Sequence, residues 1–373
     1  MKIKKNKLLI YLSLGVLLFL FTHCTTFISD NNMRWTAQYD FIDLYKKRNK
    51  GFNPGSDKQI GWIISPAKNI IIIGAQKDTP EFEPTATEKQ AVLYISTDRG
   101  QSYSELILNG EDVYDIFSPP YTKEYSIIRT QGDKYKWVYL LNHKTFKIKE
   151  IDKHKYNDKT YYDDFDGRFL KCEKNEVSFQ VDVLSKDTIK LYEVPKEFAE
   201  YQYYPVHQNG DILYYNKILE LRTYNVITGE DKLFKQLKHK YDYFLTEDYS
   251  NYNTPLSLQK VENENDEEKE IITIYDLEEN FVRKITKENR EKYYFYKDFI
   301  CDYTNLHSRG NTLRFSFDKG KTWKTHHIPM DGLLVFNKNV GFFEDKYIVF
   351  EGIFSRGASS ESGNRIMVGE FLR

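Results

Sequence analysis

Two eight-residue stretches with the same pattern decide the fold that we expect for this chain. They are Ser96-Thr97-Asp98-Arg99-Gly100-Gln101-Ser102-Tyr103 and Ser316-Phe317-Asp318-Lys319-Gly320-Lys321-Thr322-Trp323, and both read S-x-D-x-G-x-[ST]-aromatic. In a tight turn, the aspartate can accept hydrogen bonds from backbone N–H groups. The glycine can take the positive φ that such a turn requires. Each stretch therefore predicts a β-hairpin whose aromatic residue packs beneath the turn.

Hairpin patterns of this general kind recur along the whole chain. Each consists of two short runs of β-branched and aromatic residues joined by polar turn residues. We predict seven hairpins, at residues 93–107, 137–151, 177–194, 219–234, 271–285, 313–328 and 347–371. Further strand-like runs are expected to provide the inner strands, among them residues 60–65, 70–74, 125–130, 212–215 and 336–343. The best helical candidate is one short turn around residues 196–201.

The spacing of these hairpins predicts a repeat architecture. Their turn centres lie near residues 99, 144, 186, 229, 279, 319 and 359, a period of 40–50 residues. A period of this length with about four strands is typical of a β-propeller blade. We therefore predict an all-β fold, with one β-propeller domain over residues 24–373 and four-stranded antiparallel blades. Seven blades are expected, and six are the alternative.

The two opening stretches resemble the Asp-box, the repeat of bacterial neuraminidases and of many other β-propellers. In that family the box is a structural element that lies away from the active site. The resemblance therefore implies a propeller fold and says little about activity. It implies structural roles for eight residues: Ser96, Asp98, Gly100, Tyr103, Ser316, Asp318, Gly320 and Trp323.

No catalytic motif accompanies this repeat in the sequence. Neuraminidases carry an Arg-Ile-Pro string near the first blade, which this chain lacks; the nearest string, Arg365-Ile366-Met367, lies at the opposite end. The sequence also contains no P-loop, no GxGxxG and no G-x-S-x-G elbow. We therefore expect no enzyme activity, no catalytic residues and no cofactor. A sialidase-like glycosidase is the remaining enzymatic alternative.

The sequence contains two clusters of potential metal ligands. Asp164, Asp166, Gly167 and Glu173 match positions 3, 5, 6 and 12 of a calcium loop, but Tyr162 stands at position 1, where an acidic ligand is required. We interpret this segment as an acidic turn between strands. The neighbouring His326 and His327 should point to opposite faces of a strand, so they cannot easily share a metal ion. No metal site is expected.

The N-terminus has the features of an export signal. Four lysines precede the apolar stretch 8–21, and Cys24 follows it directly. This arrangement resembles the lipobox of bacterial lipoproteins, although His23 stands where that family has Gly, Ala or Ser. We expect residues 1–23 to be a signal peptide and Cys24 to carry lipid, with an uncleaved anchor or an ordinary cleaved signal as alternatives. The body should then be periplasmic and membrane-anchored, and the outer membrane is favoured because Thr25, not Asp, follows Cys24.

Charge and cysteine content narrow the possible partners and crosslinks. Lys and Arg total 54 and Asp and Glu total 55, which gives a net charge of −1. This near-neutrality, with the charges interspersed along the chain, argues against a nucleic-acid-binding protein with a basic face. Apart from Cys24, the chain has only Cys172 and Cys301, which an oxidising compartment would permit to pair. The alternative is two buried thiols.

One acidic run is a candidate for partner binding. Residues 262–270 read Glu-Asn-Glu-Asn-Asp-Glu-Glu-Lys-Glu and should form a surface loop before the strand that starts at Ile271. A solvated loop is one interpretation, and a loop that faces a basic partner is the other. The candidate binding residues are Glu262, Glu264, Asp266, Glu267 and Glu268.

The layout as a whole suggests a binding protein. A lipobox-like leader, a body of about 350 residues, strings such as Leu93-Tyr94-Ile95-Ser96-Thr97-Asp98 and the lack of a catalytic set resemble the lipase-immunity proteins encoded beside type VI secretion phospholipase effectors. The resemblance implies a periplasmic inhibitor that binds a secreted lipase-type toxin and occludes its active site. An envelope assembly scaffold and a glycan-binding propeller are the alternatives.

Overall fold

A computed structural model gives the fold of this chain. It describes residues 32–40, 60–80, 87–118, 123–185, 189–199, 203–216, 218–246, 256–263, 270–286, 293–306, 312–328, 333–334, 340–355 and 362–373. The predicted leader and Cys24 lie outside these residues. Within the described residues, none of the helices combines the length and the apolar character needed to cross a bilayer.

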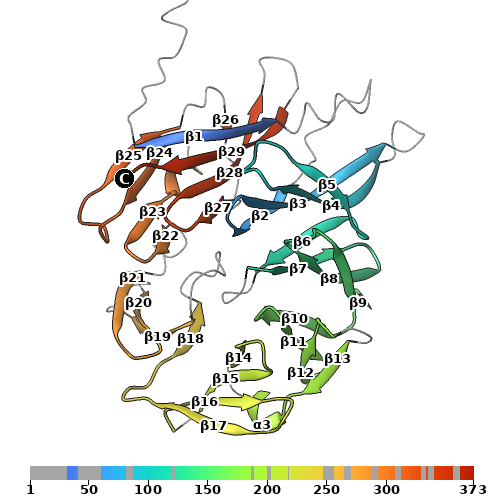
Figure 1. Cartoon of the computed structure of the whole chain (residues 1–373), viewed down its shortest axis with the longest axis vertical. Helices are drawn as coiled ribbons and strands as arrows, with labels where there is room; N and C mark the ends of the chain where they lie inside the picture. The colour runs from blue at the N-terminus through green and yellow to red at the C-terminus, as the bar shows by residue number, and fades with distance from the viewer. Residues whose placement is uncertain are drawn as a thin grey trace, which may run out of the picture.

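The described strands form seven antiparallel sheets, which are arranged around a ring as the blades of a β-propeller (Figure 1). Six blades contain four strands in chain order, from the centre of the ring outward. Blade 1 is β2 (Ile60–Ala67), β3 (Ile70–Pro80), β4 (Thr87–Ser96) and β5 (Ser104–Ile107); blade 2 is β6 (Asp112–Phe117), β7 (Tyr125–Gln131), β8 (Tyr135–Asn142) and β9 (Ile148–Lys155); blade 3 is β10 (Thr160–Phe165), β11 (Phe169–Lys174), β12 (Val177–Asp182) and β13 (Lys190–Glu193).

The next three blades follow the same order. Blade 4 is β14 (Tyr203–Val206), β15 (Asp211–Tyr215), β16 (Glu220–Asn225) and β17 (Asp231–Gln236); blade 5 is β18 (Tyr243–Thr246), β19 (Leu256–Asn263), β20 (Glu270–Tyr275) and β21 (Phe281–Thr286); blade 6 is β22 (Tyr293–Tyr296), β23 (Phe299–Asp302), β24 (Thr312–Ser316) and β25 (Lys324–His327). Within the described ranges, two short helices, α3 (Lys196–Ala199) and η1 (Thr304–Leu306), lie between strands. The seven-bladed prediction is confirmed, and so is the helical turn near residue 196.

The seventh blade is built from both ends of the chain. Its middle strands are β28 (Tyr347–Ser355) and β29 (Ser362–Phe371), and β26 (Leu333–Leu334) and β27 (Val340–Phe343) both pair with β28 at the inner position. The outer strand is β1 (Met33–Asp40), which pairs antiparallel with β29 and closes the ring.

This closure corrects one sequence-based expectation. The first six predicted hairpins are the third and fourth strands of their blades, whereas the seventh, 347–371, forms the second and third. The difference arises because the N-terminal strand supplies the fourth place, so the C-terminal part of the chain needs only the inner three.

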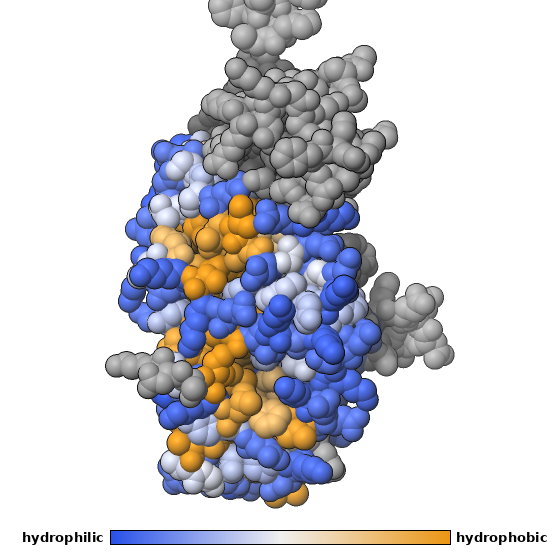
Figure 2. All heavy atoms as spheres, turned by 90° about the vertical axis from the view of Figure 1, so that its right-hand side faces the viewer, coloured by the Kyte–Doolittle hydropathy of each residue, from blue (hydrophilic) through white to orange (hydrophobic). Residues whose placement is uncertain are grey.

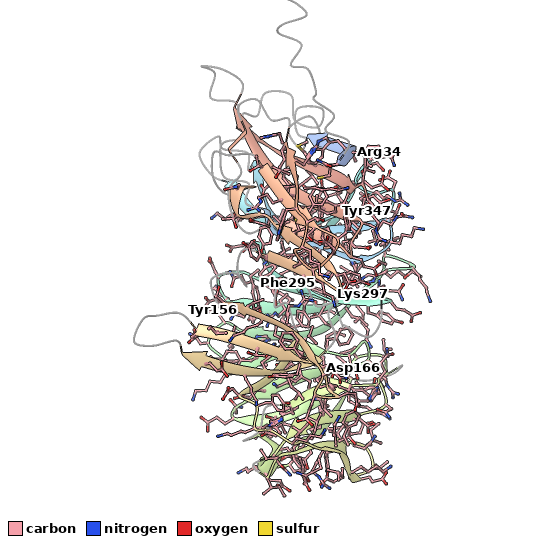
Figure 3. The ribbon with its side chains drawn as sticks, turned by 90° about the vertical axis from the view of Figure 1, so that its left-hand side faces the viewer. Arg34, Tyr156, Asp166, Phe295, Lys297 and Tyr347 are labelled. Atoms are coloured by element: carbon pink, nitrogen blue, oxygen red, sulfur yellow. The ribbon has the colours of Figure 1, made fainter. Side chains whose placement is uncertain are left out.

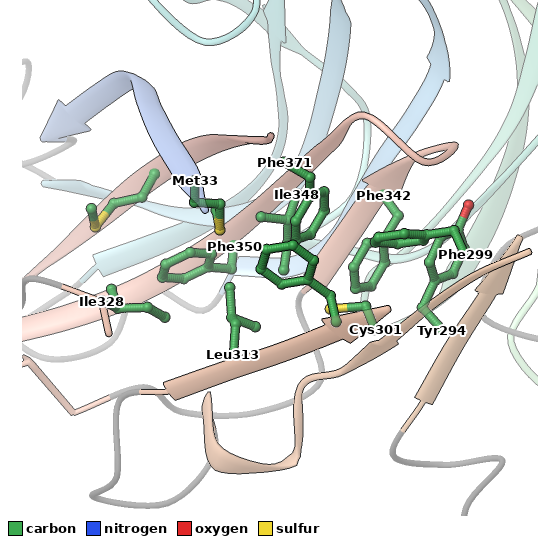
Figure 4. Packing of buried hydrophobic residues seen from close by; sticks show 12 residues of the cluster. Met33, Tyr294, Phe299, Cys301, Leu313, Ile328, Phe342, Ile348, Phe350 and Phe371 are labelled. Atoms are coloured by element: carbon green, nitrogen blue, oxygen red, sulfur yellow. The ribbon is translucent and has the colours of Figure 1, made fainter. Parts of the chain in front are cut away.

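The hydrophobic core lies between neighbouring blades. Figure 4 shows the largest cluster, in which side chains of β22–β24 pack against β27–β29, and Met33 from β1 is buried among them. The rings of Tyr294 and Phe342 stack at 4.1 Å between blades 6 and 7. This packing joins the closing strand β1 to the rest of blade 7 and to blade 6.

The two cysteines of the body are separate buried thiols. Cys172 lies on β11 in blade 3 and Cys301 on β23 in blade 6, and neither forms a disulfide. Burial raises the pKa of Cys172 to about 11 and that of Cys301 well above its usual value. Both therefore contribute as small apolar side chains.

The antiparallel order defines two ends of every blade. The turns after the first and third strands lie at one end, which we call the turn end, and the links to the next blade lie at the other, the link end. In Figure 3, Asp166 and Lys297 at the turn end lie on one side of the molecule and Tyr156 at the link end on the other.

Figure 2 shows apolar patches on the side of the ring that β5, β9 and β13 form, where Ile107 and Leu191 are exposed.

Candidate functional site

The two opening stretches form hairpins with the same hydrogen-bond network. Asp98 accepts from the hydroxyl of Ser96 at 2.8 Å, from Ser102 N at 2.9 Å and from the Ser102 hydroxyl at 2.5 Å. Asp318 accepts from the equivalent groups of Ser316 and Thr322 at 2.6–2.8 Å. The hydrogen bonds from Thr322 and Ser316 lower the pKa of Asp318 to about 2. Both carboxylates are thus engaged by their own turns.

The glycine and aromatic positions of these hairpins also match the expected turn chemistry. Gly100 and Gly320 have φ angles of 85° and 83°. The Trp323 ring lies 3.5 Å from the position that a Cβ on Gly320 would occupy, directly under the turn. Trp323 and Tyr103 are both half-buried; Trp323 covers its turn from the edge, whereas Tyr103 packs against the buried cluster between blades 1 and 7.

Both hairpins are also tied to the inner turn of their own blade. Arg99 N donates to Asn69 O at 3.1 Å in blade 1, and Lys319 N donates to Asp298 O at 2.9 Å in blade 6. These contacts hold the outer strands in register with the inner ones.

The predicted acidic loop is described only in part. Glu262 lies on β19 with an exposed side chain, 3.9 Å from the ammonium of Lys284. Glu264, Asp266, Glu267 and Glu268 lie outside the described residues, as does Cys24. The turn between β19 and β20 belongs to the link end of blade 5.

The segment that resembled a calcium loop binds its own backbone instead. Asp166 is fully buried and accepts from Arg168 N at 2.8 Å, Phe169 N at 2.7 Å and Gln208 N at 2.9 Å. The last bond crosses to the turn between β14 and β15, so Asp166 joins blades 3 and 4. Among the described residues, no group of His, Cys, Asp and Glu is arranged to hold a metal ion.

The two adjacent histidines occupy opposite faces of β25, as predicted. His326 is buried and its ring lies 5.7 Å from that of Trp35, whereas His327 is exposed.

An exposed aromatic surface, which sequence reasoning missed, lies at the link end of blades 1 to 3. Trp62 on β2 is 37% exposed, Tyr156 in the link before blade 3 is 50% exposed, and Tyr161 on β10 is 63% exposed. We call these three residues the aromatic surface. The indole N–H of Trp62 donates to Tyr114 O at 2.5 Å, and the ammonium of Lys136 lies 4.7 Å from the Tyr156 ring. These contacts hold Trp62 and Tyr156 in place from blade 2.

A charge cluster adjoins this surface on the inner strands of blades 2 and 3. The guanidinium of Arg129 forms an ion pair with Asp115, donates to Tyr162 O and lies 5.3 Å from the ring of Tyr114. Burial alone would lower the pKa of Arg129, but the facing Asp115 carboxylate raises it. Arg129 therefore remains a cation that links blade 2 to blade 3.

The second half of the cluster lies on β10 and β11. Burial, together with the charge of the neighbouring Asp163, raises the pKa of Asp164 to about 7. Lys171 lies 3.4 Å from Asp164, and its ammonium lies 4.5 Å from the ring of Tyr203 in blade 4. The cluster thus contains more carboxylates than cations, and Asp163 is its exposed member.

Two cavities flank the turn between β22 and β23. The smaller, of about 400 Å³, includes Asp345 and Arg373, which form an ion pair. The larger, of about 600 Å³, lies between blades 5 and 6, and there the guanidinium of Arg283 covers the Phe295 ring at 4.6 Å and donates to Lys297 O. Arg373 and Arg283 already bind groups of the protein itself, so we assign no ligand to either cavity.

A serine–histidine contact exists in the interior of blade 2. The hydroxyl of Ser126 lies 2.7 Å from His143 Nε2, and His143 Nδ1 lies 2.7 Å from Lys123 O. Both side chains are buried, and burial lowers the pKa of His143. Because no substrate can reach a fully buried hydroxyl, this contact is a structural hydrogen bond.

Comparison with known proteins finds remote structural similarity. No protein-family model and no curated protein matches the chain. Among solved structures, Sqt1 of Saccharomyces cerevisiae matches with 10% identity and a TM-score of 0.36, covering 86% of this chain and 98% of that one. Hsv2 of Kluyveromyces lactis matches with 9% identity and a TM-score of 0.39 over 83% and 98% of the two chains. YCF48 bound to a D1 peptide matches with 12% identity and a TM-score of 0.37 over 87% and 96%. At these values, the similarity carries no information about function.

Proposed function

We propose that this chain is a non-catalytic binding propeller whose partner is a protein. The observation that carries the proposal is the aromatic surface of Trp62, Tyr156 and Tyr161. Large rings that remain exposed at one end of three neighbouring blades are costly in a soluble protein unless another surface covers them. Tyr and Trp are also the residue types most enriched at the energetic centres of protein interfaces.

The geometry suits the capture of a protein segment. Trp62 and Tyr156 are held by contacts from blade 2, so little side-chain entropy is lost when a partner binds. One end of a propeller can provide the approximately 800 Å² per partner that a stable complex requires. The hydrogen bonds of the Asp98 hairpin keep blade 1 in register at the end opposite Trp62, and those of the Asp318 hairpin do the same for the strands of blade 6.

The proposed location is the bacterial envelope. The leader and Cys24 favour a lipid-anchored protein, and β1 would then follow the anchor after a short linker. Because β1 is the outer strand of blade 7, the anchor would attach at the edge of the ring. Blade 4 lies at the far end of the long axis from β1 (Figure 1), so it would point away from the membrane.

Within this proposal, the finer role is neutralisation of a secreted lipase-type toxin. Occlusion of an incoming enzyme needs only a stable, stoichiometric interface, which fits a propeller without a catalytic set. An envelope assembly scaffold would use the same surface for a resident protein. The two roles differ in the partner and not in the binding chemistry.

The test places a photo-crosslinking amino acid at position 156 or 161 in living cells, with position 191 as the control. Leu191 is 57% exposed on the outer strand of blade 3, away from the aromatic surface. We expect a defined protein adduct from positions 156 and 161 only. If no protein is captured there, or if position 191 captures the same proteins, the proposal is wrong.

A protection assay separates the two finer roles. Cells that produce the toxin encoded by the neighbouring gene in their periplasm should survive with the wild-type protein and die with Tyr156→Ser/Tyr161→Ser. Survival without the protein, or death despite it, would rule out the immunity role. A growth defect of the deletion strain without any toxin would favour the scaffold role.

Glycan binding is the second candidate, because exposed Trp and Tyr rings at one end of the ring also suit sugar stacking. Titration with envelope glycans, followed by tryptophan fluorescence, tests it. If a glycan binds saturably and Trp62→Ser abolishes this binding, the partner is a glycan and not a protein.

A further inference from the structure

The face of blade 3 that is turned toward blade 4 presents an aromatic ring beside two acidic side chains. Tyr161 lies directly opposite Glu173 in the pairing of β10 with β11, and Asp163 lies opposite Lys171. Residues two apart on a strand share a face, and opposite residues on paired strands have Cβ atoms about 5 Å apart. Tyr161, Asp163 and Glu173 therefore project from one patch of the sheet, which we call the acidic–aromatic face.

All three side chains of this face are accessible. Tyr161 is 63% exposed, and Asp163 and Glu173 are both exposed. The inner strand of blade 4, β14, begins at Tyr203, whose ring meets the ammonium of Lys171. Tyr161 and Glu173 lie one step further along β10 and β11 toward the link end, and both remain exposed.

Among the described residues, the two carboxylates form no close ion pair, although Lys171 lies opposite Asp163 on the same face of the sheet. Within the described part of the chain, neither Asp163 nor Glu173 forms an ion pair or a side-chain hydrogen bond, whereas Lys171 is engaged by Asp164 and Tyr203. Two negative charges beside an exposed ring attract a cation, because the ring face is itself electronegative. The same molecule shows this chemistry nearby, where Lys136 lies over the Tyr156 ring.

We propose that the acidic–aromatic face of Tyr161, Asp163 and Glu173 binds a basic side chain, lysine or arginine, of the protein partner. This rests on the proposed function and specifies the partner's chemistry at one point of its surface. The ammonium or guanidinium group stacks on Tyr161 and forms ion pairs with Asp163 and Glu173. Glu262, which is exposed near the link end of β19 in blade 5, adds a further negative charge at the same end of the ring.

The test measures binding of labelled tetralysine and tetra-arginine peptides to the purified protein by fluorescence anisotropy, with tetraglutamine as the uncharged probe. Asp163→Asn/Glu173→Gln should weaken binding of both basic peptides about tenfold. The matched control Asp133→Asn/Glu193→Gln removes two exposed charges elsewhere and should change binding by less than about twofold. Tyr161→Ser should weaken binding at high ionic strength as well, because the ring contact is less screened than an ion pair.

The outcomes separate this inference from the proposed function. If the wild-type protein binds no basic peptide, or if both double variants weaken binding equally, the acidic–aromatic face is not the site. If crosslinks at position 161 still capture a protein and Asp163→Asn/Glu173→Gln does not reduce that capture, the inference is wrong and the proposed function stands. If position 161 captures no protein, the proposed function fails even where the peptides bind. Unchanged melting temperatures of the variants show that a loss of binding is not a loss of folding.

Discussion

The closing strand β1 offers a quantitative test of the fold, because Met33 and Gly369 meet where β1 pairs with β29. Met33 is 5% exposed within the cluster between blades 6 and 7. Met33→Ala removes three buried heavy atoms, each worth about 0.8 kcal/mol of transfer free energy. With a contribution from the cavity left behind, the free energy of unfolding should fall by about 3 kcal/mol.

Gly369→Ala tests the same contact from the other strand. A Cβ at position 369 would lie 2.0 Å from Met33 Cε and 3.1 Å from Trp35 Cζ3, so the methionine must move. Overpacking of this kind typically costs about 1–3 kcal/mol. In a Met33→Ala background the nearest atom is gone, and the cost of Gly369→Ala should fall by at least about 1 kcal/mol.

Urea unfolding of the wild type, Met33→Ala, Gly369→Ala and the double variant measures this coupling. The dependence of the unfolding free energy on urea concentration should be the same for all four proteins. Met367→Ala is the control partner, since Met367 is buried in the same cluster but its position is not among the nearest contacts of a Cβ at 369. The losses of unfolding free energy caused by Gly369→Ala and by Met367→Ala should be nearly additive in the double variant. If Met33→Ala and Gly369→Ala are also additive, β1 does not pack on β29 as described, and the ring is closed in another way.

Four further predictions follow from the same structure. Asp98→Ala and Asp318→Ala should each lower the melting temperature without reducing partner binding, because each removes a carboxylate that caps its own turn; an unchanged melting temperature in both would contradict this. Trp323→Ala should cost about 1–2 kcal/mol of unfolding free energy, less than a full core truncation, because the ring is only half-buried; urea unfolding would reveal a larger cost if the ring were enclosed. Asp164 has a folded pKa of about 7, above its unfolded value, so its contribution favours the folded state at low pH and is lost as pH rises through 7; the melting temperature of Asp164→Asn relative to wild type should therefore increase from pH 5 to pH 8, and a flat difference would contradict the raised pKa. Cys24→Ser should move the protein from the membrane to the soluble fraction, and retention with an intact leader would indicate an uncleaved anchor.

The candidate site was only partly accessible to sequence reasoning. The chain has 30 tyrosines, so nothing in the sequence marks Tyr161 among them. Alternation along residues 160–165 places Tyr161 and Asp163 on one face, but the sequence pattern around Glu173 indicates only an incomplete calcium loop. Their exposure is a property of the packing between blades.

The sequence by itself determined the blades of this protein. A hairpin is local: Asp98 and Gly100, or Asp318 and Gly320, set the turn within a few residues, and the adjoining strands follow from β-branched and aromatic runs. The regular recurrence of such local units then indicates a propeller. Only the tertiary structure decided how the ring closes and which rings stay exposed. Both depend on contacts between residues far apart in the chain, such as Met33 with Phe371, and the local pattern of either segment contains no information about its partner.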